Sequence, residues 1–138
     1  MNIFTRLKAY LHFKESIRQV DERLLTSGQR HYVLPGKFCD LVVTDRQNFR
    51  GLRMKHYITN RRAKMIDVVK ECFYHTSYAD GHGAMDAERL AIRWDQYYLW
   101  YENGRKEKTA FKREQRRKRR ELRKKRKEAR NGKHEKAA

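Results

Sequence analysis

The chain has 138 residues and a formal net charge of +18, from 35 Lys and Arg against 17 Asp and Glu. A charge of this size repels itself in a compact chain, so it favours a function beside nucleic acid or another acidic partner. With two cysteines, no apolar run long enough to cross a membrane and no signal-peptide core, we expect no disulfide framework, no transmembrane helix and no secretion.

The charge is unevenly distributed along the chain. Residues 105–136 carry 18 Lys and Arg and five Glu, a net charge of +13, which leaves +5 for the first 104 residues. Both tryptophans and all eight tyrosines lie before residue 105. We therefore predict a small α+β docking domain over residues 1–104 and a basic helical C-terminal arm over residues 105–138. The expected fold is predominantly helical, with one β-hairpin and a long basic C-terminal helix.

The N-terminal segment shows the periodicity of an amphipathic helix of about six turns. The stripe that we expect to face the core is Ile3, Leu7, Tyr10, Lys14, Ile17, Asp21 and Leu24, thickened by Phe4, Leu11 and Val20. Ser27-Gly28 follows as a stop signal. A basic amphipathic helix is also typical of a membrane surface. Because acids and bases both line its polar face, we prefer packing of this helix on its own domain.

Two short β-prone runs, His31–Leu34 and Phe38–Val43, flank Pro35-Gly36, a sequence that suits a type II turn. The pattern predicts a β-hairpin, which must lie on helices because an isolated hairpin is only marginally stable. Asp45 then provides an N-cap for a short basic helix over about residues 46–56.

Two more helices are expected before the arm. Thr59 or Asn60 begins the first, whose apolar face is Met65, Ile66, Val69 and Phe73. Glycines and small polar residues predict a loop over residues 75–84. The second helix runs from Asp86 to about Glu102, with an aromatic stripe of Leu90, Ala91, Trp94, Tyr97, Tyr98 and Tyr101. Such a stripe can stack nucleic-acid bases, but at helical spacing it is more often core, and we assign it to the core.

The arm after Asn103-Gly104, which is either a break or a soft joint, has almost no hydrophobic face. Its glutamates recur every seven residues, at positions 107, 114, 121, 128 and 135. On a helix they form one slowly drifting stripe. Glu114–Lys118 and Glu121–Lys125 are the expected i,i+4 ion pairs. We expect Asn131-Gly132 to end the helix, and self-repulsion to fray the arm in free solution.

The arm is the candidate binding site. Its guanidinium and ammonium groups can contact phosphate all round a helix, driven by counterion release and without base-specific readout. A solvated charge run or a localisation signal is the alternative interpretation. The residues that we predict to contact nucleic acid or an acidic partner are Lys112, Arg113, Arg116, Arg117, Lys118, Arg119, Arg120, Arg123, Lys124, Lys125, Arg126, Lys127 and Arg130.

Metal-binding and catalytic patterns are weak by comparison. Cys72 and His75, with His82 nearby and Cys39 and His31 on the predicted hairpin, supply only one close ligand pair, whereas a structural zinc site usually shows two. Asp80, His82 and Asp86 lie in or beside the predicted loop without a nucleophile motif, phosphate loop or carboxylate pair. We therefore predict no catalytic residue, no metal site, no cofactor and no enzymatic activity.

Four segments resemble a known group of proteins: RHYVLP at residues 30–35, VTDRQNFR at residues 43–50, KHYI at residues 55–58 and ECFYHT at residues 71–76. The chain resembles small basic proteins of Bacteroidetes bacteria and their crAss-like phages over most of the domain, without the arm. The resemblance brings no enzymatic motif and no functional residue. It implies a phage virion component, such as an auxiliary capsid or head-associated protein.

Together these features predict a non-enzymatic structural protein of a large nucleoprotein assembly, located in a virion or in the host cytoplasm. The expected partners are nucleic acid, through phosphate contacts, acidic protein surfaces and other subunits of the assembly. We expect no membrane partner and no small-molecule substrate. The alternatives are a freestanding non-specific nucleic-acid-binding or ribosome-associated protein and a metal-dependent enzyme that uses the region around Cys72, His75 and His82.

Overall fold

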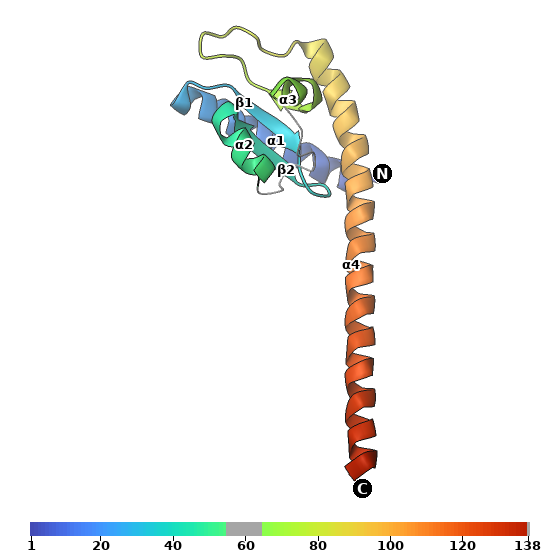
Figure 1. Cartoon of the computed structure of the whole chain (residues 1–138). Coiled ribbons are helices and arrows are strands. Elements are labelled where there is room, and N and C mark those ends of the chain that lie inside the picture. Colours follow the sequence, from blue (N-terminus) through green and yellow to red (C-terminus); the bar gives the residue numbers. More distant parts are fainter. Residues whose placement is uncertain (55–64, 138) are drawn as a thin grey trace. The chain divides into compact units, whose positions relative to one another are not determined.

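A computed structural model describes residues 1–54 and 65–137 of the chain. The elements in chain order are α1 (Ile3–Ser27), β1 (His31–Pro35), β2 (Leu41–Asp45), α2 (Arg46–Met54), α3 (Met65–Glu71), β3 (Tyr74–His75) and α4 (Ala87–Ala137) (Figure 1). This confirms the predicted α+β class with helices predominating. The chain divides into two compact units, Met1–Arg105 and Lys106–Ala138, and α4 contributes residues to both.

Helix α1 has the predicted ends but a different buried face. Asn2 Oδ1 accepts a hydrogen bond from the Thr5 backbone amide at 2.8 Å, and Gly28 ends the helix in the left-handed region at φ 71°. The buried side chains are Ala9, Phe13, Ser16 and Val20. Ala9, Phe13 and Ser16 each precede a residue of the predicted stripe by one position, so the buried face is rotated by about 100° from that stripe. Val20 was part of the prediction. The small side chains of Ala9 and Ser16 allow close packing, which a count of apolar residues does not register.

The predicted hairpin is confirmed, but its connection is not a type II turn. Strand β1 extends through Pro35, which pairs with Leu41, and the strand predicted from Phe38 begins three residues later. The left-handed residue is Phe38, with φ 56°, whereas Gly36 is not left-handed. A Cβ on Gly36 would lie 2.9 Å from the Asp40 carbonyl oxygen, so this glycine provides space rather than backbone freedom.

A third strand completes the sheet in the order β2-β1-β3, with both pairings antiparallel. Strand β3 has two residues and includes His75, the first residue of the predicted loop. Two residues are too few to produce an alternating pattern, so the sequence offered no signal for this strand. Phe73, expected on the face of the preceding helix, lies beyond the end of α3 and is buried beside β3.

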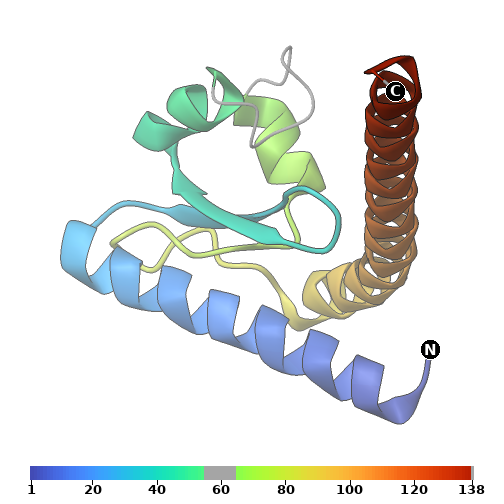
Figure 2. The same ribbon diagram turned by 90° about the horizontal axis from the view of Figure 1, so that it is seen from below.

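The central strand β1 is buried on both faces of the sheet. Val33 belongs to the core that contains α1, Phe73 and the first turns of α4. Tyr32 and Leu34 point to the other side, where they pack with Phe49 of α2 and with residues of α3. The domain therefore has three layers, with α1 on one face of the sheet and α2 and α3 on the other (Figure 2).

The caps and ends of α2 and α3 agree in part with the sequence. Asp45 Oδ1 accepts a hydrogen bond from the Asn48 amide at 2.8 Å, which confirms the predicted N-cap of α2. The predicted helix start at Thr59 or Asn60 lies outside the described residues, as do the last residues expected in α2.

Helix α4 passes through both Asn-Gly pairs without a break. The helix is not broken at Gly104, and the predicted end at Asn131-Gly132 is wrong because the helix continues to Ala137. A Cβ on Gly104 would lie 2.3 Å from the Phe38 carbonyl oxygen and 2.9 Å from the Cys39 amide nitrogen. Glycine is therefore required at position 104 because the backbone of the hairpin connection touches the helix there.

Replacing Gly104 with Ala is expected to destabilise the domain by about 1–3 kcal/mol, because backbone atoms have to move to admit the methyl group. Thermal unfolding followed by tryptophan fluorescence measures this effect. Gly132→Ala is the matched control, since a Cβ there meets no atom within 4 Å. The control should leave the domain's midpoint unchanged and stabilise the arm's helix by about 0.5–1 kcal/mol. Equal midpoints for the two variants would contradict the close contact at Gly104.

Candidate nucleic-acid interface

The arm is the part of α4 that lies in the second unit, from Lys106 onward. All of the basic residues that we predicted to contact nucleic acid, from Lys112 to Arg130, are exposed on this helix. An α-helix advances 1.5 Å per residue, so these cations are distributed over about 27 Å of its length. The structure therefore presents the predicted site as a continuous, solvent-exposed array of cations.

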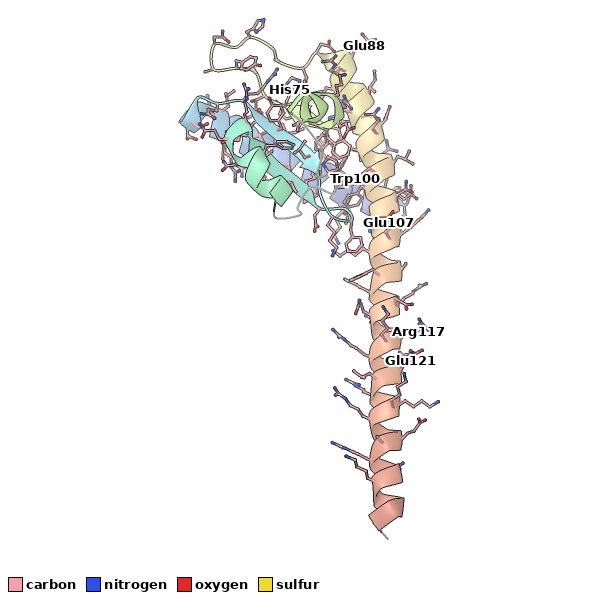
Figure 3. The ribbon with its side chains drawn as sticks, in the orientation of Figure 1. His75, Glu88, Trp100, Glu107, Arg117 and Glu121 are labelled. Carbon is pink, nitrogen blue, oxygen red and sulfur yellow. The ribbon has the colours of Figure 1, made fainter. Side chains whose placement is uncertain are left out.

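Arg117 forms ion pairs with two glutamates of the arm. Its guanidinium contacts Glu114 at 2.5 Å, one turn before it. It also contacts Glu121 at 3.2 Å, one turn after it (Figure 3). The hydrogen bonds from Arg117 lower the pKa of the Glu114 carboxyl, and Glu114 in turn raises the pKa of Arg117. Both groups are exposed, so added salt screens this attraction.

The predicted partners of these glutamates were Lys118 and Lys125, and the structure shows Arg117 in their place. Two guanidinium nitrogens of Arg117 reach both oxygens of Glu114, a geometry that a single ammonium group does not have. The positive charge of Lys118 makes only a smaller contribution to the lowered pKa of Glu114.

The aromatic residues of the predicted stripe on α4 pack in or against the core of the domain. Tyr97 is fully buried, and its hydroxyl donates a hydrogen bond to the Ala9 carbonyl oxygen of α1 at 2.8 Å. Burial raises the pKa of this hydroxyl. The Trp94 ring centroid lies 4.3 Å from that of Phe13. These contacts confirm the assignment of the stripe to the core rather than to base stacking.

Two details of the stripe differ from the prediction. Ala91 is exposed, and Leu90 is only half-buried. Trp100, which we did not include, packs against the core with its ring centroid 5.1 Å from that of Phe73 (Figure 3). Trp100 lies three residues after Tyr97, so the helical spacing itself was the available signal.

The loop residues considered for catalysis have structural roles. Asp80 Oδ1 accepts a hydrogen bond from the His82 backbone amide at 2.9 Å, and Asp86 Oδ1 accepts one from the Arg89 amide at 2.6 Å at the start of α4. Arg30, which sequence reasoning did not single out, holds the loop. Its guanidinium donates to the Thr76 carbonyl oxygen at 2.8 Å and also to the carbonyl oxygen of Gly83.

Cys72 and His75, which were considered for metal binding, each contact a different backbone carbonyl oxygen. Cys72 is buried, its thiol donates to the Val69 carbonyl oxygen at 3.6 Å, and burial raises its pKa to about 11. The Nδ1 atom of His75 lies 3.0 Å from the Thr76 carbonyl oxygen. Within residues 1–54 and 65–137, no three His, Cys, Asp or Glu side chains are grouped so that they could hold a metal ion.

Cys72 is expected to resist alkylation by iodoacetamide at pH 8 in the folded protein, because its thiol is buried and stays protonated. Cys39 is also free but only half-buried, so it should react first. Mass spectrometry of the two cysteine-containing peptides, with and without denaturant, measures both rates. Rapid native labelling of Cys72 would show that this thiol is accessible and would reopen its role as a ligand.

An exposed apolar surface lies on the N-terminal half of α1. We call Ile3, Phe4, Leu7 and Leu11 the α1 apolar patch. Ile3 and Phe4 are more than four-fifths exposed, at 82% and 83%. A shallow groove of about 380 Å³ runs beside the patch and is lined by Asn2, Phe4, Thr5, Leu7, Lys8, Leu11 and Arg105. Large contiguous apolar patches on a protein surface are typical of interaction sites.

Comparisons with protein-family models, with curated proteins and with solved structures find no match to this chain. No helix among the described residues is long and apolar enough to cross a membrane. The charge of the arm and the α1 apolar patch are the features of the molecule that bear on its function.

Proposed function

We propose that this chain is a non-enzymatic structural protein of a nucleoprotein assembly, in which the arm contacts nucleic-acid phosphates and the domain docks on another subunit. The observation that carries the proposal is the net charge of +13 over residues 105–136 on an exposed helix. Most of these cations lie in unit 2 of the chain, and those from Lys112 to Arg130 are exposed. Charge repulsion disfavours packing of this array on its own positively charged chain, whereas a polyanion attracts and neutralises it.

Phosphate binding by the arm needs no base-specific geometry. Each phosphate that a Lys or Arg neutralises releases condensed counterions, and this release drives non-specific binding. The arm holds its cations on a helix without a loop or a second element that could position a guanidinium against one base edge. The proposed interaction is therefore independent of base sequence.

The α1 apolar patch supports docking of the domain on a protein subunit. Lys8 and Arg105 line the groove beside the patch, so the complementary surface is an apolar one edged by Asp and Glu. A second copy of this chain fits less well, because two chains of +18 repel each other. A patch of this kind favours a member of an assembly over a freestanding nucleic-acid-binding protein.

The assembly that we propose is a phage virion. The resemblance of the domain to small basic proteins of Bacteroidetes and their crAss-like phages supports it. A head filled with nucleic acid would also supply the counter-charge that the arm needs.

Binding to three duplexes of equal length and unrelated sequence tests the nucleic-acid part of the proposal. We expect dissociation constants that agree within about threefold, because phosphate contacts carry no sequence information. Fluorescence anisotropy at fixed ionic strength measures them. A preference of a hundredfold for one duplex, or no binding to any, would refute this part of the proposal.

Leu7→Asp combined with Leu11→Asp is expected to reduce the copy number of the chain in purified nucleoprotein particles, while the free protein keeps its fold. Both leucines are about half exposed, so the charges disturb docking more than the core. Leu25→Asp combined with Leu99→Asp is the matched control, since both side chains are exposed outside the patch. Wild-type copy number for the Leu7 and Leu11 variant would exclude the patch as the docking surface.

A further inference from the structure

The seven-residue spacing of the glutamates divides the arm into two sides. At 100° per residue, the positions two, five and six residues after a glutamate lie on the opposite side of the helix from it. Between residues 107 and 133 these positions hold ten Lys or Arg and no carboxylate. We call them the cationic face: Lys112, Arg113, Arg116, Arg119, Arg120, Arg123, Arg126, Lys127, Arg130 and Lys133.

The other side of the helix is close to neutral. Over the same residues, the glutamate positions and those one, three and four residues after them hold four Glu and five Lys or Arg. The remaining positions on this side are neutral, and include Ala110, Gln115, Leu122 and Ala129. The net charge is therefore +10 on the cationic face and +1 on the glutamate side.

The structure supports this division. Arg117, which belongs to the glutamate side, is held by Glu114 and Glu121. The members of the cationic face are all exposed, and none forms an ion pair with a carboxylate that the structure describes. Ten exposed cations without a described ion pair thus lie together on one side of the arm, on the side away from its glutamates.

We propose that the arm binds duplex nucleic acid through the cationic face, with the glutamate side turned away from the phosphates. This inference rests on the proposed function and adds an orientation to it. The reverse orientation would bring four carboxylates toward the phosphates, where like charges repel. From Lys112 to Lys133 the cationic face is about 32 Å long, close to one turn of B-form duplex.

Two sets of three Lys→Gln substitutions test the orientation with equal loss of charge. K112Q/K127Q/K133Q removes three cations from the cationic face, and K118Q/K124Q/K125Q removes three from the glutamate side. Glutamine forms helices nearly as well as lysine, so circular dichroism should show equal helix content. The probe is a 30-base-pair duplex, with binding measured from 50 to 200 mM salt.

The cationic-face set is expected to lose on the order of a hundredfold in affinity at 150 mM salt, and to reduce the slope of log K against log salt by about three. The glutamate-side set should lose less than about threefold, with the slope almost unchanged. Its lysines lie nearer the middle of the arm. If affinity depended only on the total charge and not on the side of the helix, this set would therefore cause the larger loss of affinity. Equal losses, or a larger loss for the glutamate-side set, would overturn the inference.

Lysine footprinting on the unmodified protein gives an independent readout. Acetylation in the presence of the duplex should be slowed at Lys112, Lys127 and Lys133 and should continue at Lys118, Lys124 and Lys125. Equal protection of the two groups contradicts the orientation while leaving nucleic-acid binding intact. Failure of the wild-type chain to bind the duplex at all refutes the proposed function itself, so the two failures are distinguishable.

Discussion

A chain that ends at Arg105 is expected to lose most of its affinity for nucleic acid, by at least about a hundredfold at 100 mM salt, and to keep a folded domain. Residues 105–136 have a net charge of +13 on an exposed helix, whereas the first 104 residues have a net charge of only +5, so most counterion release is expected from the arm. Ending at Arg105 keeps the Gly104 contact and the hydrogen bond from Arg105 to the Thr5 hydroxyl at 2.6 Å. Anisotropy with a 30-base-pair duplex measures the loss.

The control for this truncation is a chain that ends at Lys133. It removes only the last five residues and should bind as the full chain does. The thermal midpoint of the Arg105 variant, followed by tryptophan fluorescence, should match that of the full chain. Binding retained by the Arg105 variant would place the interface in the domain and would contradict the assignment of the arm.

Phe13→Ala is expected to have the largest effect on stability, a loss of about 3–5 kcal/mol. The Phe13 ring is fully buried, with its centroid 4.3 Å from that of Trp94 and 4.5 Å from that of Tyr97. Truncation leaves a cavity where α1 meets α4. For a domain of about 100 residues, 1 kcal/mol shifts the midpoint by about 4–8 °C, so the loss should exceed 12 °C.

Phe4→Ala, on the same helix, is the control for Phe13→Ala. Its ring is 83% exposed, so its loss should change the free energy of unfolding by less than about 0.5 kcal/mol. Denaturant titration of the two variants gives both values. If Phe13→Ala kept the wild-type midpoint but lost nucleic-acid binding, the aromatic cluster would be a binding surface and not the core.

Local signals in the sequence predicted the ends of several elements. Gly28 and Asp45 act as expected, because a helix cap depends on the few residues around it. Features set by distant contacts were missed. The buried face of α1 depends on how closely Ala9 and Ser16 approach the rest of the core, and Gly104 is a glycine because Phe38 touches it. Neither contact is visible in the neighbouring sequence.

The candidate site was predicted as a list of residues but not as a surface. The sequence identified the exposed cations from Lys112 to Arg130, since a charge run needs no tertiary contact to be recognised. The pairing of Glu114 and Glu121 with Arg117 was not predicted, because each glutamate has a Lys four residues after it as well as Arg117 within one helical turn. The seven-residue spacing of the glutamates was the signal in the sequence that distinguishes the two sides of the arm.

The salt dependence of duplex binding by the full chain tests the central claim most directly. If the arm neutralises six or more phosphates, log K should fall with log salt with a slope of about −5 or steeper. Affinity should then drop at least about a thousandfold between 50 and 200 mM salt. A slope near zero, or the same slope in the chain that ends at Arg105, would contradict the account.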